Sequence, residues 1–524
     1  MGIIEYSMYF PKINIKSNSD KIVKMLGYEP QKYTSMSIFV SVMIAIISAM
    51  VSMLFDLIDP LLAAVGGFVA TFVFFIMIPK IELKKKANEI EAELPIFLKS
   101  FGLLLEMNIT FQKALEMASK GHGELEKEIT NAINEIKNGI GIRKAILSLA
   151  ITTESMSVKR AVSQIVSLYE IGSAGSEIRR IGDELLSIEQ HKLKEYSARS
   201  AMFGLFFIMS SAILPTFFLI YAIAGKTILR HNIGETEMAL MMLIVFPMIS
   251  VLILLISKAT MPRSAFSAKS GFDIVMLIPG VLLVTGFLVA PDFKMIIIPL
   301  GLVTGAYFVY LNYGKEKRAE EIDDRIPDAL FSISGMPKST SPERMFGIIE
   351  TGEYGALSEE AKKSVQQLKS NVNIDSVLDD LWERNSSSML RRVCQMLGHM
   401  IHTNSIDKVS ILAEDIIRSF QIRRERSQIF ALQKYTLIFG GVLIALILKM
   451  AISLLKSMDG IVDGESIMSS IAFSESLIPA YFIVYSMIAA TAIADAEGKK
   501  SSLGIYFIVL FVLSMATFVF VTLT

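Results

Sequence analysis

Cysteine is almost absent from this sequence, because Cys394 is the single cysteine among 524 residues. A disulfide framework is therefore excluded, and so is a structural zinc site made of cysteine thiolates. We expect Cys394 to be a small buried apolar residue. Histidine is also scarce, at five residues, and the pair His399 and His402 has no clear carboxylate partner in the pattern. We predict no metal site.

Nucleotide-binding and metalloprotease motifs are missing as well. No segment matches GxxxxGK[ST] or HExxH, so the sequence contains neither a P-loop nor that zinc-binding motif. We predict no catalytic residue, no cofactor and no enzymatic activity. Lysine plus arginine equals aspartate plus glutamate, at 51 each, so the net charge indicates no nucleic-acid partner.

Apolar residues, by contrast, are abundant, at 52% of the chain with a mean hydropathy of +0.52. This composition is typical of a membrane protein, in which a spanning helix needs about 20 mostly apolar residues. Nine stretches qualify, at 38–55, 60–79, 201–224, 238–257, 274–290, 294–313, 435–455, 476–494 and 503–523. We predict an all-α polytopic membrane protein with about nine transmembrane helices.

Basic residues orient these spans. The first 37 residues lack the apolar region of a cleaved signal peptide, so the first span is expected to direct insertion. Lysine and arginine gather on one set of loops, as at Lys84, Lys85 and Lys86, which places the N-terminus in the cytoplasm and the C-terminus outside. The predicted order is a cytoplasmic segment 1–37, spans 38–79, a bundle 80–200, spans 201–257, a basic loop 258–273, spans 274–313, a bundle 314–434, and spans 435–494 and 503–523.

The two long cytoplasmic segments show apolar residues at helical spacing. In the first, helices are expected to begin near 95, 110, 124, 141, 155 and 174. One face of the third carries Leu125, Ile129, Ala132, Ile133 and Ile136. Each segment is therefore predicted to fold as a small helical bundle.

The sequence also repeats itself. "ELPIFLKS" at 93–100 matches "RIPDALFS" at 325–332, and their prolines, Pro95 and Pro327, are 327 − 95 = 232 residues apart. The same offset aligns Gly123 with Gly355, Arg160 with Arg392, and Pro247 with Pro479. We predict a tandem parallel repeat of two spans, a bundle and two spans, in which Pro95 and Pro327 each lie in the first turn of a bundle helix.

These features resemble a known family. The "LPIFL" start, the amphipathic bundle, the two-span return and the second such unit are similar to the inner-membrane platform proteins of type II secretion and type IV pilus systems, the secretion F-domain family. Two spans ahead of each bundle resemble the archaeal branch, which serves archaella and archaeal pili. The second copy departs at 335–341, where Gly335 and Pro337 should shorten its first helix.

The resemblance implies a platform beneath a growing filament. It implies a hexameric secretion ATPase as the cytoplasmic partner, pilin-like subunits and the lipid bilayer as membrane partners, and a possible homodimer. The nucleotide chemistry would belong to the ATPase.

Basic residues of the two bundles are the predicted partner-binding site, since positive charge would steer an acidic ATPase surface. They are Lys159, Arg160, Arg179, Arg180, Arg391, Arg392, Arg423 and Arg424. The alternative is that they form solvated faces or contact lipid headgroups. Inside the spans, Pro247 and Pro479 are either packing kinks or hinges.

A secondary transporter or channel built from parallel repeats is the alternative function, and a membrane scaffold or receptor is a third. Transport generally requires an ionisable residue or a polar path at the midplane. No acidic residue lies mid-span, and Lys449 is near the outer part of the seventh span, where it can reach the interface. The sequence therefore favours the platform.

Overall fold

The structure is a computed structural model that describes residues 20–25, 28–55, 60–153, 155–172, 175–228, 234–262, 294–385, 387–457, 464–497 and 500–520. The regular elements in these ranges are helices, which confirms the all-α class for this part of the chain. The chain forms two compact units, of which the first extends to Leu186 and the second begins at Ser187. Each unit is described by itself.

Seven helices among the described residues are long and apolar enough to cross a membrane. They are Pro30–Met50, Ala64–Glu106, Gly175–Ile223, Glu235–Thr260, Ile406–Ser457, Ser469–Glu497 and Ser501–Phe520. They overlap seven of the nine predicted stretches. Stretch 274–290 lies outside the described residues, and stretch 294–313 lies in α13 (Lys294–Ser334) but is not among the seven. Nine spans therefore remain a prediction.

The first unit opens with an antiparallel helical hairpin. Helices α2 (Pro30–Phe55) and α3 (Pro60–Glu106) pack along each other, with α1 (Asp20–Met25) against both. The Tyr33 hydroxyl donates a hydrogen bond of 2.6 Å to the Phe75 carbonyl, which joins the two helices inside a small apolar cluster. With 47 residues, α3 is about 70 Å long and extends well beyond the thickness of a bilayer.

The prediction that Pro95 and Pro327 begin bundle helices is wrong. Pro95 lies inside α3, and Pro327 lies inside α13, far from either N-terminus. A proline in a helix interior removes one backbone hydrogen bond and costs about 3 kcal/mol. Packing offsets this cost, because the residues around Pro95, such as Leu94 and Leu98, are buried.

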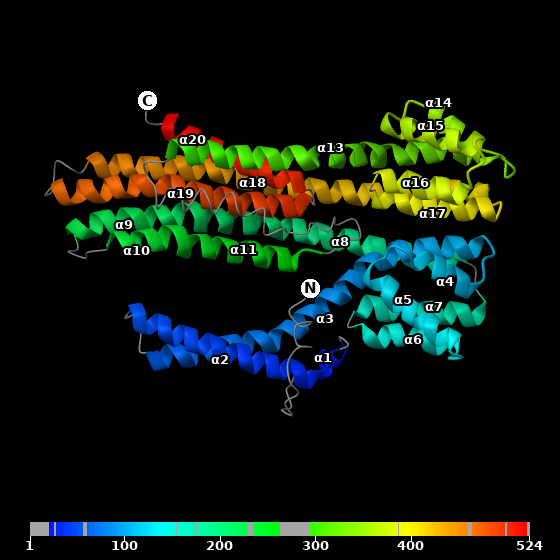
Figure 1. Ribbon diagram of the computed structural model, residues 1–524, viewed down its shortest axis with the longest axis horizontal. Coiled ribbons are helices and arrows are strands. Elements are labelled where there is room, and N and C mark those ends of the chain that lie inside the picture. Colours follow the sequence, from blue (N-terminus) through cyan, green and yellow to red (C-terminus); the bar gives the residue numbers. More distant parts are fainter. Residues whose placement is uncertain are drawn as a thin grey trace. The chain divides into compact units, whose positions relative to one another are not determined.

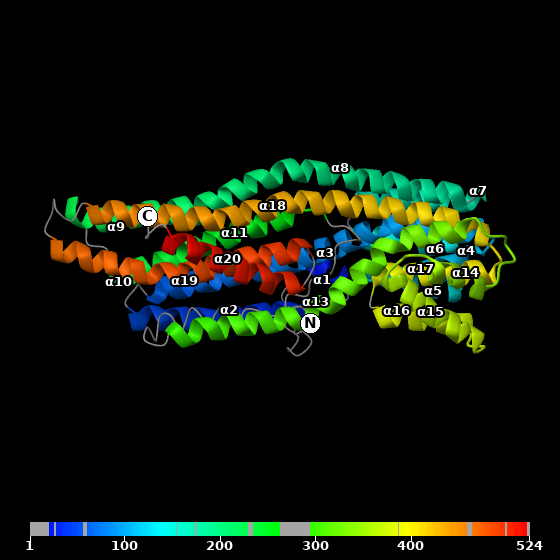
Figure 2. The same ribbon diagram turned by 90° about the horizontal axis from the view of Figure 1, so that it is seen from above.

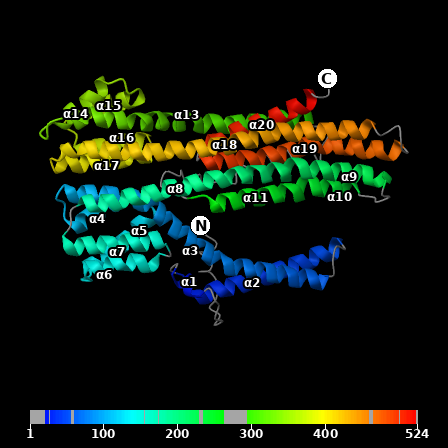
Figure 3. The same cartoon turned by 180° about the vertical axis from the view of Figure 1, so that it is seen from behind.

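The first bundle consists of the end of α3 with four shorter helices and the start of a fifth (Figure 3). These are α4 (Phe111–Ser119), α5 (Glu124–Lys137), α6 (Ile142–Thr152), α7 (Met156–Ile171) and α8 (Gly175–Ile208). Five of the six predicted helix starts are thus confirmed to within about one residue. The predicted apolar face of α5 is also confirmed at Leu125, Ile129, Ala132 and Ile133, which are buried, whereas Ile136 is half-buried.

The second bundle has the same succession of helices. The end of α13 is followed by α14 (Pro342–Thr351), α15 (Ala356–Lys369), α16 (Ile374–Asn385), α17 (Ser388–His402), the short turn η6 (Ile406–Lys408) and α18 (Val409–Ser457). Figure 2 shows α13 running as one helix from the membrane-length helices into this bundle. Helix α13 ends at Ser334, before Gly335, as the sequence predicted.

The membrane-length part of the second unit is a packed group of helices (Figure 1). It contains the end of α8, η2 (Met209–Ile213), α9 (Leu214–Ile228), α10 (Glu235–Leu240), η3 (Met241–Val245), α11 (Phe246–Thr260), α18, α19 (Gly464–Glu497) and α20 (Lys500–Phe520). Its core includes Phe207, Ile444, Leu448, Ile478 and Phe482. Helix α18 continues without a break from the second bundle into this core.

Candidate functional site

Backbone geometry matches between the two bundles at the 232-residue offset. Helices α5 and α15 each have 14 residues and begin after a glycine of nearly equal φ, 57° at Gly123 and 58° at Gly355. Left-handed residues also coincide, because Gly139 and Gly172 of the first bundle correspond to Asn371 and Asn404 of the second. Asparagine is one of the few residues other than glycine that adopts this conformation readily.

A capping serine recurs at the start of α7 and α17. The Ser155 hydroxyl accepts a hydrogen bond from the Val158 N–H and donates one of 2.6 Å to the Glu91 carboxylate on α3. At the corresponding positions, the Ser387 hydroxyl accepts from the Leu390 N–H and donates to Asp323 on α13. Each helix N-terminus is thus attached to the long helix that leaves the membrane-length region. Sequence reasoning missed both pairs, although the 232-residue offset aligns their serines and acids.

An ion pair links the long helix to the second short helix in both bundles. Lys86 Nζ lies 2.6 Å from Glu128 Oε1 in the first, and Arg318 lies 3.1 Å from Glu360 Oε1 in the second. A third pair has exchanged the positions of its basic and acidic residues, because Arg143–Glu170 at 2.9 Å corresponds to Asp375–His402 at 2.8 Å. The pairings therefore match even where the residues differ.

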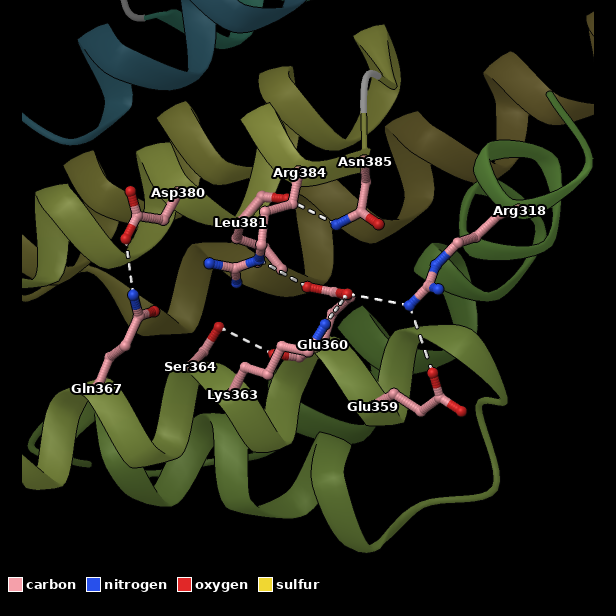
Figure 4. Close-up of polar contacts among 10 residues, drawn as sticks. All are labelled: Arg318, Glu359, Glu360, Lys363, Ser364, Gln367, Asp380, Leu381, Arg384 and Asn385. Atoms are coloured by element: carbon pink, nitrogen blue, oxygen red, sulfur yellow. Dashed lines mark hydrogen bonds and ion pairs between the residues drawn. The ribbon is translucent and has the colours of Figure 1, made fainter. Parts of the chain in front are cut away.

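Glu360 is the centre of a cationic cluster in the second bundle (Figure 4). Its carboxylate is 2% exposed and receives Lys363 Nζ at 2.8 Å and Arg384 Nε at 2.9 Å, in addition to Arg318. Arg318 also lies 3.3 Å from Glu359. Burial by itself would raise the pKa of the Glu360 carboxyl, but the hydrogen bonds from Lys363 and Arg384 outweigh it and hold that pKa below its ordinary value.

The cluster joins three helices. Arg318 comes from α13, Glu360 and Lys363 from α15, and Arg384 from the last turn of α16, so the polar contacts tie the bundle together at one pole. None of its members was predicted as a site residue. Only the recurrence of Glu128 at Glu360 signalled it in the sequence.

The predicted basic residues of the first bundle have different environments. Lys159 is exposed, and Arg160 is exposed while paired with Glu184 at 2.7 Å. Arg180 is exposed beside Glu177. Arg179 instead lies largely inside the fold, 3.5 Å from Glu106, where it covers the crossing of α3 and α8. Lys159 and Arg180 are thus the residues of this set that are best placed to meet a partner.

In the second bundle, three of the four predicted basic residues are half-buried. The Arg391 guanidinium stacks 4.6 Å from the centre of the Trp382 ring, and Arg423 lies 3.3 Å from Asp323. Arg392 is also half-buried, whereas Arg424 is exposed. The matched pair Arg160 and Arg392 therefore does not form matched exposed surfaces.

The membrane-length core contains two π-helical turns, and the first of them has buried serine hydroxyl groups. These turns, η2 and η3, end two residues before Pro215 and Pro247, respectively. Ser210 of η2 lies 3.0 Å from Ser250 of α11, and Tyr481 of α19 donates to the Ser211 carbonyl. Pro479 lies inside α19, near Tyr481, so Pro247 and Pro479 occupy different local structures. Proline and π-helical turns are recognised causes of helix bending.

Ionisable residues give no metal centre in the part of the chain that the structure describes. His402 pairs with Asp375 at 2.8 Å. Lys449 reaches Glu475 at 4.0 Å and lies over the Phe518 ring, in keeping with its predicted position near one end of the span.

These observations define a polytopic helical membrane protein whose long helices continue into small helical bundles. Residues 97–222 match the family model described as "Type II secretion system (T2SS), protein F". The match spans the first bundle and extends into α9, and it supports a platform protein of type II secretion or type IV pilus systems. Proteins of that family are non-catalytic and generally interact with a secretion ATPase and the bilayer. No curated protein and no solved structure matches the chain.

Proposed function

We propose that this chain is a membrane platform for assembly of a type IV filament or a related secretion machine. It would receive movement from a cytoplasmic hexameric ATPase and pass it to pilin-like subunits in the membrane. The observation that carries the proposal is the construction of the two bundles on helices that continue from membrane-length segments, namely α3, α13 and α18. A continuous helix transmits displacement along its axis with little internal deformation.

The chain would contain two copies of one module. The matched caps Ser155 and Ser387, the matched pairs Lys86–Glu128 and Arg318–Glu360, and the matched left-handed residues support a tandem duplication. Matching of tertiary contacts is stronger support than sequence identity, because each contact needs two residues to correspond. The tandem form also favours the archaeal branch, in which the filament would be an archaellum or a pilus.

Docking of the ATPase would use exposed basic residues, chiefly Lys159, Arg180 and Arg424. We expect Lys159→Glu combined with Arg424→Glu to reduce co-purification of the cognate ATPase about tenfold, since charge reversal opposes electrostatic steering. The control is Arg143→Ala with Glu170→Ala, which removes an exposed ion pair of the first bundle without changing net charge. Undiminished ATPase binding in the reversed variant would contradict basic docking, and absence of binding by the unmodified protein would contradict ATPase coupling.

Orientation in the membrane is tested by cysteine labelling. Cys394 is buried, so it should not react in the folded protein. Engineered cysteines can then be placed at two exposed positions, Lys113 of the first bundle and Ser457 at the end of α18, and each reports on which side of the membrane it lies. We expect a membrane-impermeant maleimide to label the residue introduced at Ser457 in intact cells, and the one at Lys113 after permeabilisation. The reverse order would place the bundles outside.

The alternative, a transporter or channel, would require solute flux in proteoliposomes without an ATPase. The buried hydroxyls of Ser210, Ser250 and Tyr481 are the feature that favours it, since they put polar groups into the membrane-length core. Flux that is abolished by Tyr481→Phe would support this function over the platform.

A further inference from the structure

The cationic cluster around Glu360 contains more positive than negative charges. Arg318, Lys363 and Arg384 supply three positive charges, whereas Glu359 and Glu360 supply two negative charges. In the first bundle, the corresponding carboxylate of Glu128 is paired with Lys86, and Asn131 and Thr152 stand where the second bundle has Lys363 and Arg384. The two extra cations at these positions are therefore particular to the second bundle.

The three cations are held by ion pairs but keep part of their hydrogen-bonding capacity and exposed surface. Arg384 donates to Glu360 through Nε, and the described residues provide no hydrogen-bond acceptor for its two terminal nitrogens. The side chains of Arg318, Lys363 and Arg384 remain 48%, 50% and 31% exposed. A guanidinium edge and an ammonium held near one another suit a phosphate group, which accepts several charge-assisted hydrogen bonds at once.

The cluster is also close to the predicted membrane surface. Arg318 lies five residues beyond residue 313, where the sixth predicted span ends, which is about 8 Å along a helix. Lys317 and Lys362 are exposed nearby in the sequence. Basic residues immediately next to a span attract anionic lipid headgroups.

We propose that Arg318, Lys363 and Arg384 form a phosphate-binding site, and that the phosphate is that of an anionic phospholipid headgroup. Glu360 is the positioning residue, because it holds the three cations in a fixed arrangement without neutralising them. A bound headgroup would attach the membrane-proximal pole of the second bundle to the bilayer surface. This inference rests on the proposed membrane topology, but not on the ATPase or on a filament.

The test uses the full-length protein in nanodiscs, with bound lipid measured by native mass spectrometry after extraction. We expect the unmodified protein to retain phosphatidylglycerol about tenfold more than Lys363→Asn/Arg384→Thr, which installs the residues of the first bundle. Retention of phosphatidylcholine should be the same for both. The control, Lys338→Asn/Arg344→Thr, removes two cations elsewhere on the second bundle and should retain phosphatidylglycerol normally.

Three results would overturn the proposal. One is equal loss of phosphatidylglycerol in the control, which indicates general electrostatic attraction. Another is equal retention of the two lipids by the unmodified protein. The third is saturable stabilisation by inorganic phosphate with no lipid preference, which identifies free phosphate as the source. Lys363→Arg keeps the positive charge and should retain phosphatidylglycerol as well as the unmodified protein does. Protection of Cys394 from a thiol reagent verifies that each variant is folded.

Failure of this proposal is distinguishable from failure of the proposed function. Lipid retention is measured without the ATPase, and ATPase co-purification is measured with the cluster intact.

Discussion

The Tyr481 hydroxyl donates a hydrogen bond to the backbone carbonyl of Ser211, which lies four residues before Pro215. Proline has no N–H to offer that carbonyl, so the tyrosine replaces a helical donor in the buried core. Residues 211 and 481 belong to helices that are far apart in the sequence. The pairing therefore repairs a local defect by tertiary contact.

We predict that Tyr481→Phe destabilises the membrane-length core by about 1–3 kcal/mol, because it removes a buried hydrogen bond to a carbonyl that the residue four positions later, Pro215, cannot serve. In a Pro215→Ala background, the backbone N–H is restored, and the same substitution should cost less. The thermal midpoints of the four proteins in detergent form a double-mutant cycle that measures the coupling.

Tyr485→Phe is the control for that cycle. Its hydroxyl donates a hydrogen bond of 2.6 Å to the Leu437 carbonyl, and residue 441, four positions later, is a glycine with an N–H. Its loss should be independent of Pro215. Equal coupling of both tyrosines to Pro215 would refute a specific repair by Tyr481.

Glu360→Gln should destabilise the second bundle by about 1–3 kcal/mol at neutral pH, because three cations lose the carboxylate that they share. The loss is limited because each cation stays partly solvated. Cys394 reports the effect, because it is buried in α17 of the same bundle. The rate of thiol labelling under native conditions should rise. Glu128→Gln, in the first bundle, should leave that rate unchanged.

The contribution of Glu360 has a defined pH dependence. Its pKa is lowered in the folded protein, so its stabilisation is complete above the ordinary carboxyl pKa of about 4.3 and is lost as pH falls through the lowered value. Stability measured from pH 7 down to pH 3 should therefore fall less steeply for Glu360→Gln than for the unmodified chain. Parallel curves would show that the carboxylate is not stabilised by its cations.

Cys394 should resist modification in the folded protein. It is 2% exposed, and burial raises the pKa of its thiol, so both access and thiolate formation are suppressed. We expect maleimide labelling at pH 7.5 to follow opening of the second bundle and to become complete in denaturant. Rapid labelling without denaturant would contradict the packing of α17.

Gly175→Ala should disrupt the crossing of α3 and α8. A Cβ at residue 175 would lie 2.0 Å from the Gly102 carbonyl oxygen, and a backbone atom cannot move aside cheaply. We expect a loss of about 1–3 kcal/mol, measured as a lower thermal midpoint. Gly347→Ala is the control, because it lies inside α14 with open space around the added methyl group and should stabilise by up to about 1 kcal/mol.

Helix positions in the first bundle were predictable from the sequence because apolar spacing and glycine breaks are local signals. The starts of α4 to α8 and the buried face of α5 followed from them. The end of α13 followed equally from Gly335 and Pro337. Pro95 was misread, because a proline marks a helix end only when surrounding packing does not hold the helix together.

The site residues were less predictable, because charge in a sequence does not reveal burial. Lys159 and Arg424 are exposed, yet Arg179 and Arg391, which look equivalent in the sequence, are held against other side chains. The Glu360 cluster combines residues from 318, 360 and 384, and no local pattern joins them.

The sequence by itself determined that the chain is helical, that it contains several apolar stretches long enough to span a membrane, and that two bundles interrupt these stretches. These properties depend on composition and periodicity, which are local. Only the tertiary structure decided which carboxylates receive cations, which serines cap against the long helices, and that Tyr481 completes the hydrogen bonding near Pro215. Those contacts join residues that are distant in the chain, so their energies appear only when the helices pack.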